Sequence, residues 1–292
     1  MFIAGIDGGG THTRLELRDG ENRFIRRQQF GPFNLNSIGE SAFRMLLEEV
    51  FAACGSMSDC AGFCVGGAGN RNPRMREILA QELEKVGFRG SWTLCGDQEI
   101  ALRGAMDGPG AVLIAGTGSI CYGRSADGKT AASGGFGHLI DDGGSGYAVG
   151  RDVLSAAVRA VDGRTENSAI LEKVLQRLHA ETVQEIISFV YAPTTDKSAV
   201  AGLSSIALEL AEANDPEARA ILRREAGELA QLVLAVRRRL SLGRCPVALL
   251  GGLLSSDNVY RRIVAEQMDG IAAPVAPLHD ALWGAAQMAW EL

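Results

Sequence analysis

The stretch FIAGIDGGGTHTRLELRDG, residues 2–20, decides how this chain folds. It opens with a short apolar run, passes through three glycines, and ends in a segment where charged and apolar side chains alternate. Alternation with a period of two is typical of a β-strand, and the pair Asp19-Gly20 is typical of a turn. The stretch therefore predicts two strands joined by a glycine loop, and not a strand that runs into a helix.

A glycine loop of this kind can hold phosphate, because glycine lets backbone amides approach an anion and tolerates positive φ. No lysine of a P-loop follows the glycines, and no helix of a dinucleotide-binding fold follows them either. A plain tight turn explains the glycines equally well. Asp7 favours the phosphate interpretation, because a carboxylate at the end of a buried strand needs a cation or hydrogen bonds. Magnesium among nucleotide phosphates would satisfy it, and Thr11 and Thr13 add hydroxyl donors.

Working outward, the first third of the chain predicts the order β-β-β-α-β-α-β-α. The hydrophobic spacing places strands at about 24–30, 60–65 and 92–97 and helices at 40–54, 74–86 and 98–106. A second glycine-loop hairpin follows in AVLIAGTGSICYGRS, residues 111–125, so the chain looks like a duplicated domain. Helical patterns then dominate to about residue 242, with Asn214-Asp215-Pro216 marking a helix start. CPVALLGGLL, residues 245–254, is a buried strand entering a Gly-Gly turn, and a helix ends the chain.

Composition excludes several classes of function. The net charge of −6 argues against a nucleic-acid partner, and no apolar run approaches the roughly 18 residues of a membrane span. The N-terminus has no basic segment followed by a long apolar one, so we expect a cytoplasmic protein with free thiols. Cys60 and Cys64 lie in a predicted strand, and their even spacing predicts that both point to one face.

Four motifs in order make the chain resemble a known family. GIDGGGTHT, AGTGS and VALLGGLL resemble the two phosphate motifs and the adenosine motif of the actin-like ATPase superfamily, which includes sugar kinases, actin and heat-shock chaperones. SGGFGHLIDDGGSGYAVGR is similar to the GGWG…GDEGSGYWIGR segment of the N-acetylglucosamine kinase and BadF/BadG-type ATPase family, and CGDQEIAL takes the place of its TDA segment. The resemblance covers nearly the whole chain.

The resemblance implies an α/β fold of two duplicated ribonuclease H-like domains, with mixed sheets and flanking helices around a central cleft. The first domain would span 1–112 plus a C-terminal helix at about 279–292, and the second 113–278. ATP would lie in the cleft, with Mg²⁺ organised by Asp7 through water in the family pattern. The enzyme would be an ATP-dependent phosphotransferase that phosphorylates the 6-hydroxyl of an amino sugar, with N-acetyl-D-glucosamine as the first choice.

The resemblance also carries roles over to particular residues. Asp97 matches the catalytic base that takes the proton from the sugar hydroxyl, although a helix N-cap also explains an aspartate there. The remaining residues fall into three groups: Gly8, Gly9, Gly10, Thr11, Thr13, Gly116, Thr117, Gly118 and Ser119 for the phosphates; Gly251 and Gly252 for the adenosine; and Asn34, Asp97, Thr117, Gly135, Phe136 and Asp142 for the sugar.

Two departures from the family pattern concern the sugar. Phe136 stands where the family usually has tryptophan, which keeps an apolar wall and loses an N–H donor. Gly143 replaces the acidic residue of DEGSG and removes a carboxylate, so glucosamine and N-acetylmuramic acid-type sugars remain rival acceptors. His138 next to this segment is either a sugar contact or a structural residue.

Two further classes stay open as alternatives. An ATPase that activates a radical dehydratase would need a cysteine-held iron–sulfur cluster, and no segment like NDKCAAGTG is present. A non-catalytic sugar sensor would not need Asp7 and Asp97 together with two phosphate loops. The expected partner is a small-molecule sugar, without nucleic acid or membrane, and the sequence allows a homodimer without requiring one.

Overall fold

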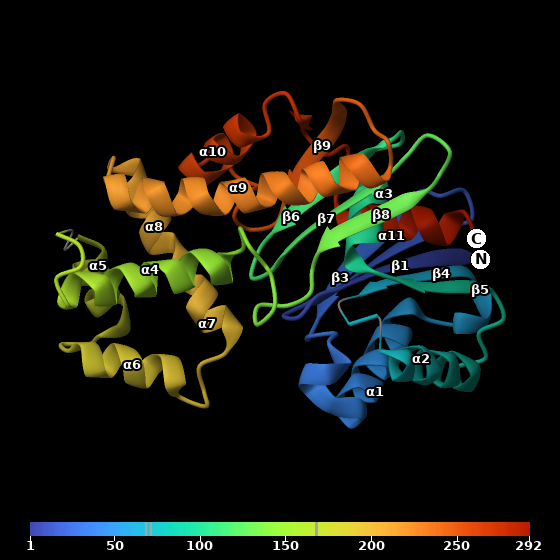
Figure 1. Cartoon of the computed structure of the whole chain (residues 1–292). Coiled ribbons are helices and arrows are strands. Elements are labelled where there is room, and N and C mark those ends of the chain that lie inside the picture. The colour runs from blue at the N-terminus through green and yellow to red at the C-terminus, as the bar shows by residue number, and fades with distance from the viewer. Residues whose placement is uncertain (68, 71, 167–168) are drawn as a thin grey trace. The chain divides into compact units, whose positions relative to one another are not determined.

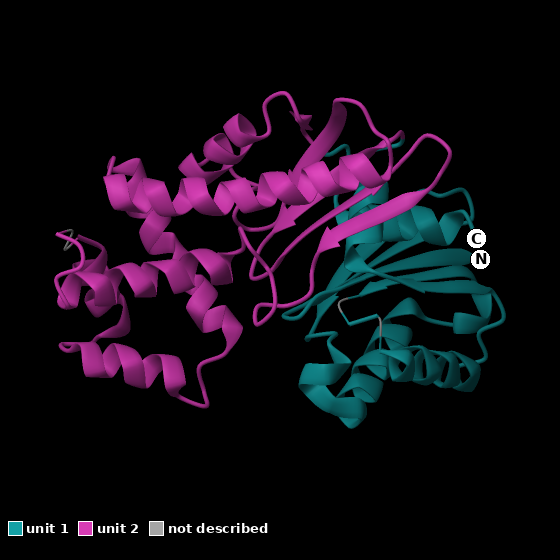
Figure 2. Ribbon diagram, viewed as in Figure 1, with its two compact units in different colours: residues 1–107, 277–292 teal, residues 108–276 magenta. Residues whose placement is uncertain are grey.

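The computed structural model describes residues 1–67, 69–70, 72–166 and 169–292 (Figure 1). The chain divides into two compact units (Figure 2). Unit 1 comprises Met1–Asp107 together with Pro277–Leu292, and unit 2 comprises Gly108–Ala276. Each unit contains one five-stranded sheet, and each sheet carries one of the two glycine hairpins.

Unit 1 contains five strands, four α-helices and a short 3₁₀ turn among its described residues. In chain order they are β1 (Phe2–Gly8), β2 (Thr13–Asp19), β3 (Phe24–Phe30), α1 (Leu35–Cys54), η1 (Met57–Asp59), β4 (Cys60–Gly67), α2 (Pro73–Lys85), β5 (Ser91–Cys95), α3 (Asp97–Ala105) and α11 (Ala281–Trp290). This is the predicted order β-β-β-α-β-α-β-α, completed by the helix that ends the chain.

The sheet of unit 1 has the strand order β3-β2-β1-β4-β5. β1 pairs antiparallel with β2 and β2 with β3, whereas β1–β4 and β4–β5 are parallel. One face of the sheet packs on α1 and α2, and the other packs on α3 and α11. Because β1, β4 and β5 run in the same direction, the residues that follow them meet at one edge of the sheet.

Helix α11 reaches the sheet because two strand residues lack side chains. A Cβ on Gly5 would lie 2.2 Å from the Ala286 amide nitrogen, and one on Gly62 would lie 2.0 Å from the Ala289 carbonyl oxygen. Contacts this short cannot be relieved, since the opposing atoms are backbone. The glycines therefore let the last helix pack directly on β1 and β4, the strands that carry the first glycine loop and its neighbour.

The expectation that Cys60 and Cys64 share one face is wrong. Phe2 pairs with Cys60 but the next pair is Ile3 with Gly62, so Ala61 is an extra residue in β4. A β-bulge of this kind reverses the alternation of side chains beyond it. Cys60 accordingly packs in the core under α1 and α2, and Cys64 packs on the opposite face with α3 and α11.

Unit 2 repeats the same sheet and adds more helices. Its elements are β6 (Gly110–Ala115), β7 (Ser119–Arg124), β8 (Thr130–Gly134), α4 (Gly146–Val161), α5 (Ala169–Leu178), α6 (Val183–Tyr191), α7 (Lys197–Gly202), α8 (Ser204–Glu212), α9 (Pro216–Arg239), β9 (Cys245–Leu250), α10 (Val259–Gln267) and β10 (Ala272–Val275). Helix α9 starts as predicted, with the Asp215 side chain accepting a hydrogen bond from the Ala218 amide. It lies along β7 and β8 (Figure 1).

The strand order of unit 2 is β10-β9-β6-β7-β8. Here too the first three strands in sequence form an antiparallel meander, and the last two add in parallel. Strand by strand this matches unit 1, which confirms the predicted duplication. Strand β10 was not anticipated, because its segment AAPV is short and contains a proline, which is tolerated at the edge position that it occupies.

Each helix of the described residues is too short or too polar to cross a membrane.

Candidate active site

The first glycine loop is the turn of a β-hairpin. Gly8 pairs with Thr13 at the end of the ladder, and the Gly9 amide donates to the His12 carbonyl at 2.9 Å. Within the described residues, the amides of Gly10 and Thr11 have no acceptor, so they are available to an anion. Thr13 differs from the expectation: it is fully buried, and its hydroxyl donates to the Gly31 carbonyl at 2.7 Å. Its hydroxyl hydrogen therefore holds the hairpin in place.

Asp7, the last side chain before the glycines, is opposite Arg14 in the hairpin. The Arg14 guanidinium forms an ion pair with the Asp7 carboxylate, including a bond from Nε at 3.2 Å. Arg14 also approaches Asp280 at 3.7 Å. The carboxylate therefore has one cationic partner from the protein, and a magnesium ion would have to share or replace it.

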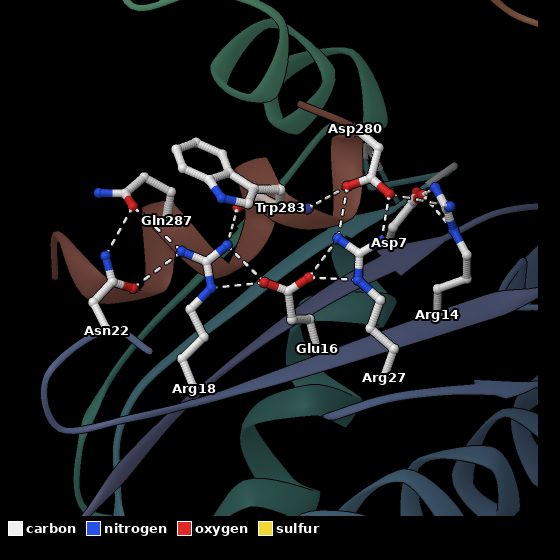
Figure 3. A network of polar contacts seen from close by, with 9 residues as sticks. All are labelled: Asp7, Arg14, Glu16, Arg18, Asn22, Arg27, Asp280, Trp283 and Gln287. Atoms are coloured by element: carbon white, nitrogen blue, oxygen red, sulfur yellow. Dashed lines mark hydrogen bonds and ion pairs between the residues drawn. The ribbon is translucent and has the colours of Figure 1, made fainter. Parts of the chain in front are cut away.

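The Asp7–Arg14 pair is one end of a charged network across unit 1 (Figure 3). Arg27 joins Asp280, at 2.8 Å, to the buried Glu16, at 2.6 Å. Glu16 in turn pairs with the buried Arg18 at 2.6 Å. The guanidinium of Arg18 also reaches α11, where it donates to the Trp283 carbonyl and the Gln287 amide oxygen. The network ties the first glycine loop to the C-terminal helix.

Asp97 is the first residue of α3, and the cap position belongs to Gly96. The Glu99 carboxylate reaches back to accept from the Gly96 amide at 2.8 Å. The alternative interpretation of Asp97 as the N-cap is therefore wrong, because Gly96 and Glu99 fill that role. The Asp97 carboxylate accepts from the adjacent Gln98 amide, at 3.0 Å, and its side chain remains exposed.

The pKa of Asp97 is raised above its ordinary value, first because the protein atoms around the accessible carboxylate partly desolvate it, and then by the negative charge of Asp7. β1 and β5 are parallel to β4, so Asp7 and Asp97 both lie at the carboxyl edge of the sheet. The two carboxylates at this edge differ in their partners, because an arginine holds Asp7 and no described arginine or lysine pairs with Asp97. Such a pair can divide the tasks of holding a cation and accepting a proton.

Asn34 also lies near the first loop, since the Phe33 amide donates to the Gly9 carbonyl at 3.0 Å. It is the N-cap of α1, and its side-chain oxygen accepts from the Asn36 amide at 3.1 Å. Helix α1 starts earlier than predicted and is broken at Gly39, whose φ is 78°. The hydrogen bonds of the described residues leave the Asn34 side-chain nitrogen free to donate to a ligand.

The second glycine loop, in unit 2, is built in the same way and is braced by α4. The Gly116 amide donates to the Gly118 carbonyl at 2.9 Å, between the paired residues Ala115 and Ser119. The first amides of α4 donate to this loop: Gly146 to Gly116 at 2.7 Å and Tyr147 to Thr117 at 3.3 Å. Of the described residues, none accepts from the amides of Thr117 and Gly118. The positive end of α4 adds to the attraction for an anion here.

The predicted adenosine turn adjoins this loop. β6 and β9 are parallel and Ile114 pairs with Leu250, so Gly251 follows the same sheet edge as Gly116. Gly251 has a φ of 89°, and a Cβ there would lie 2.3 Å from the Ala115 carbonyl oxygen. Only glycine fits this turn. Unit 2 therefore brings its proposed phosphate and adenosine residues together.

The segment after β8, predicted to line the sugar site, contains both buried and exposed side chains. Asp142 is buried with a left-handed φ of 64°, and its carboxylate lies 2.9 Å from where a Cβ on Gly118 would be. Asp142 is thus next to the second phosphate loop. Phe136 and the preceding Gly135 are exposed, so within unit 2 the ring forms no packed wall. The His138 ring contacts the Tyr147 ring edge-on at 4.7 Å, a structural contact.

Two residues that the sequence analysis did not single out, Glu225 and Tyr260, hold this segment by hydrogen bonds to Gly144. Glu225 of α9 accepts from the Gly144 amide at 2.7 Å, and the buried Tyr260 hydroxyl donates to the Gly144 carbonyl at 2.8 Å. The Glu225 carboxyl also hydrogen-bonds Asp152 of α4. Burial, together with that second carboxyl group, raises the pKa of Glu225 to about 7. Glu225 and Asp152 therefore share a proton below neutral pH.

We expect Glu225→Gln to remove part of the pH dependence of stability. The folded protein keeps the Glu225 proton to about pH 7, whereas the unfolded chain releases it near the ordinary value of 4.5. Stability from this group is complete below pH 4.5 and is lost as the pH rises through 7. Glutamine mimics the protonated acid: its oxygen accepts from Gly144 and its nitrogen donates to Asp152.

Denaturant unfolding between pH 5 and 8 measures this effect. The wild type should lose on the order of a few kcal/mol across the range, at about 1.4 kcal/mol per pKa unit, and Glu225→Gln should lose much less. Glu209→Gln, on the exposed surface of α8, is the control and should follow the wild type. Equal slopes for the wild type and Glu225→Gln would contradict the assignment.

Two mixed five-stranded sheets of the same strand order, each with a glycine hairpin at its carboxyl edge, define the class of actin-like ATPases. The chain belongs to the BadF/BadG/BcrA/BcrD ATPase family, whose model matches residues 4–289. The predicted fold class and family are both confirmed.

Two curated relatives and one solved structure are similar over most of their length. The N-acetylmuramic acid/N-acetylglucosamine kinase of Clostridium acetobutylicum is 32% identical over 265 residues, covering 88% of this chain and 87% of the relative. The N-acetyl-D-glucosamine kinase of Dictyostelium discoideum is 27% identical over 287 residues, covering 92% and 90%. The crystal structure of an N-acetylglucosamine kinase candidate from Chromobacterium violaceum has a TM-score of 0.78 and 25% identity, and covers 98% of each chain.

Proposed function

We propose that this protein is an ATP-dependent kinase that phosphorylates the 6-hydroxyl of an amino sugar, with N-acetyl-D-glucosamine as the preferred acceptor. The observation that carries the proposal is the pair of carboxylates Asp7 and Asp97 at the sheet edge that also bears the first glycine hairpin. The names of the two curated relatives support the choice of acceptor. The proposed substrate partner is a small sugar, and the proposed location is the cytoplasm.

The proposed arrangement divides the substrates between the two units. We assign the ATP phosphates to the free amides of the hairpin at 8–13 in unit 1 and of the hairpin at 116–119 in unit 2. Gly251 and Gly252 lie against the adenosine, while Asn34 and Asp142 bind the sugar. Phosphoryl transfer needs little more from the protein than positioning, neutralisation of charge and a base, and these residues supply all three.

Asp7 fits a magnesium site of the kind that nucleotide kinases use. It is a carboxylate at a strand end with free backbone amides next to it, and oxygen ligands are what Mg²⁺ prefers. Bound there with ATP, the ion would neutralise the phosphates. Arg14 would then turn from Asp7 toward Asp280, 3.7 Å away, or toward the phosphates. Asp97 is the proposed base, because its carboxylate is exposed, is not needed as a cap, and has a raised pKa.

The direct test is ADP release measured against a panel of sugars. The panel contains N-acetylglucosamine, glucosamine, N-acetylmannosamine, N-acetylmuramic acid and glucose, each with ATP and Mg²⁺. We expect N-acetylglucosamine to give the highest kcat/KM and glucose to lie at least about tenfold lower, because the site loses the interactions with the amide. Mass spectrometry of the product should show one added phosphoryl group, and EDTA should stop the reaction.

The controls separate a kinase from the other classes. ADP release that does not depend on any sugar would point to an ATPase and would contradict the proposal. Binding of a sugar without phosphorylation would point to a sensor. A preference for glucosamine or N-acetylmuramic acid would keep the kinase and change its acceptor.

A further inference from the structure

Gly143 is the position where this chain departs most clearly from its family pattern, and another side chain occupies the space beside it. Glu228 of α9 lies with its Cβ, Cγ and Oε2 atoms 3.0, 3.1 and 3.4 Å from the point where a Cβ on residue 143 would be. Gly143 is not among the residues with positive φ, so its backbone would accept a side chain. What crowds a side chain at 143 is therefore Glu228 and not the local conformation, and either side chain would have to shift by a few tenths of an ångström to make room.

The backbone that faces Glu228 is held from three sides. Ser119, the last residue of the second phosphate loop, donates its hydroxyl to the Gly143 carbonyl at 2.7 Å. On the next residue, Glu225 and Tyr260 hold the Gly144 amide and carbonyl. Glu225 and Glu228 are one turn apart on α9, which places them on the same side of the helix. The buried hydrogen bonds of Glu225 and Tyr260 to Gly144 thus fix where Glu228 lies relative to Gly143.

The Glu228 carboxylate itself is free. Its side chain is exposed, and the described residues offer it no hydrogen bond and no ion pair. It borders a cavity of about 690 Å³ between α4 and α9, together with Gly143 and Asp141. Three arginines of the described residues line the cavity: Arg151 and Arg224 are both paired with Asp152, and Arg159 lies in the last turn of α4, where its charge acts on Glu217. The Glu228 carboxylate is therefore available to a ligand, next to the segment after β8 that was predicted to line the sugar site.

We propose that Glu228 binds hydroxyl groups of the acceptor sugar and so supplies, from α9, the carboxylate that the loop lacks at Gly143. This inference rests on the proposed kinase function. A carboxylate accepts hydrogen bonds from two hydroxyls at once, and such charge-assisted bonds are the strong ones. Asp141 and Asp142 add negative charge on the same segment, and none of the described cations pairs with either. The site therefore favours uncharged or cationic sugars over sugars that carry a carboxylate.

The test compares Glu228→Gln and Glu228→Ala with the wild type on the acceptor that the sugar panel identifies. We expect KM for that sugar to rise about tenfold to a hundredfold in both variants, with KM for ATP within about twofold of the wild type. The affinity for N-acetylmuramic acid, measured as KM or as an inhibition constant, should fall less than that for the neutral sugar. Glu217→Gln removes a carboxylate from the other end of the same cavity and should leave both KM values unchanged.

A double variant makes the argument specific to this pair of positions. Glu228→Ala removes the Cγ and the carboxylate that crowd residue 143 and leaves only the Cβ, 3.0 Å from where a Cβ at 143 would lie. Adding Gly143→Glu then returns a carboxylate from the loop side, after a shift of a few tenths of an ångström at this contact. We expect this combination to lower KM for the sugar relative to Glu228→Ala alone. Thermal melts of Glu228→Gln and Glu228→Ala should match the wild type, since Glu228 is exposed.

The outcomes separate this inference from the function on which it rests. If the wild type phosphorylates no sugar of the panel, the proposed function fails and this inference fails with it. If the wild type is an active kinase and Glu228→Gln and Glu228→Ala leave KM for the sugar within twofold, the kinase stands and the role of Glu228 is refuted. A rise in KM that also appears in Glu217→Gln would refute it too, because cavity charge alone would then explain the effect.

Discussion

Replacing Asp97 with asparagine should lower kcat for sugar phosphorylation by about 10²–10⁴-fold, the usual cost of losing a general base. Asparagine keeps the shape of the side chain and still accepts the hydrogen bond from the Gln98 amide. The helix should be unaffected, because its cap is formed by Gly96 and Glu99. The loss is therefore expected in kcat, with the KM values for sugar and ATP and the melting temperature close to those of the wild type.

The pH profile gives an independent readout of the same residue. Since burial and Asp7 raise the pKa of Asp97, the acid limb of kcat/KM should lie above the ordinary aspartate value of 3.8 and should disappear in Asp97→Asn. Glu99→Gln is the matched control on the same helix, with the same change of charge and a retained cap, and should keep nearly full activity. A turnover of Asp97→Asn within tenfold of the wild type would remove Asp97 from the role of base.

The second large effect is expected in stability, for Glu16→Ala. Glu16 is 2% exposed and is paired with Arg18, which is itself buried, and with Arg27. Its removal leaves the Arg18 charge without its counterion inside the protein, and breaking a buried pair in this way costs about 3–5 kcal/mol. Arg18 keeps weaker partners in α11 and its position over the Trp283 ring, 4.9 Å from the centroid. These contacts place the expected loss toward the lower end.

Urea unfolding at pH 7 measures this loss as a shift of the midpoint at constant m. Glu16→Gln should fall between the wild type and Glu16→Ala, because an amide oxygen still accepts one hydrogen bond. Glu21→Ala breaks the exposed ion pair with Arg23 and should cost less than about 1 kcal/mol. A loss below 1 kcal/mol for Glu16→Ala would mean that the network of Figure 3 contributes little to folding.

The same network attaches the C-terminal helix α11 to unit 1. Helix α11 follows a long excursion of the chain through unit 2, yet its residues Trp283 and Gln287 bind Arg18 of β2. Asp280, at its N-cap, binds Arg27 and approaches Arg14, the partner of Asp7. We therefore expect that a substitution that displaces α11 also disturbs the first glycine loop, because the ion pairs of Asp280 and Arg14 connect the two.

Much of the fold was predictable because its signals are local. Alternating residues in β2, the apolar run of β1 and the helical spacing of residues 40–54 each report the structure of their own segment. The strand–glycine–strand pattern appears twice, which suggested a duplicated domain, and the family resemblance then implied the duplicated α/β fold. Strand β10 was not predicted, because four residues that include a proline show almost no periodic pattern. Only the pairing with β9 makes this segment a strand.

The misses share a physical cause. Whether Cys60 and Cys64 share a face depends on one bulged residue, which the sequence of a buried strand does not mark. The position of Asp97 alone favoured a cap and the family resemblance favoured a base, until the structure placed Glu99 on the Gly96 amide. The pairing of Arg14 with Asp7 could have been predicted from the sequence, because a hairpin that closes at Gly8 and Thr13 places these two residues opposite each other.

By itself the sequence determined the order of the strands in the first third of the chain and the glycine hairpins, since these follow from hydrophobic period and backbone freedom over short spans. Its motifs, through their resemblance to a known family, implied the class of fold. Only the tertiary structure decided which side chains serve the site and which hold it together. It assigned Thr13 to the Gly31 carbonyl, released Asp97 from capping, and brought Glu228 from a distant helix to the space beside Gly143. Hydrogen-bond partners and side-chain contacts depend on positions that are far apart in the chain, and no local pattern records them.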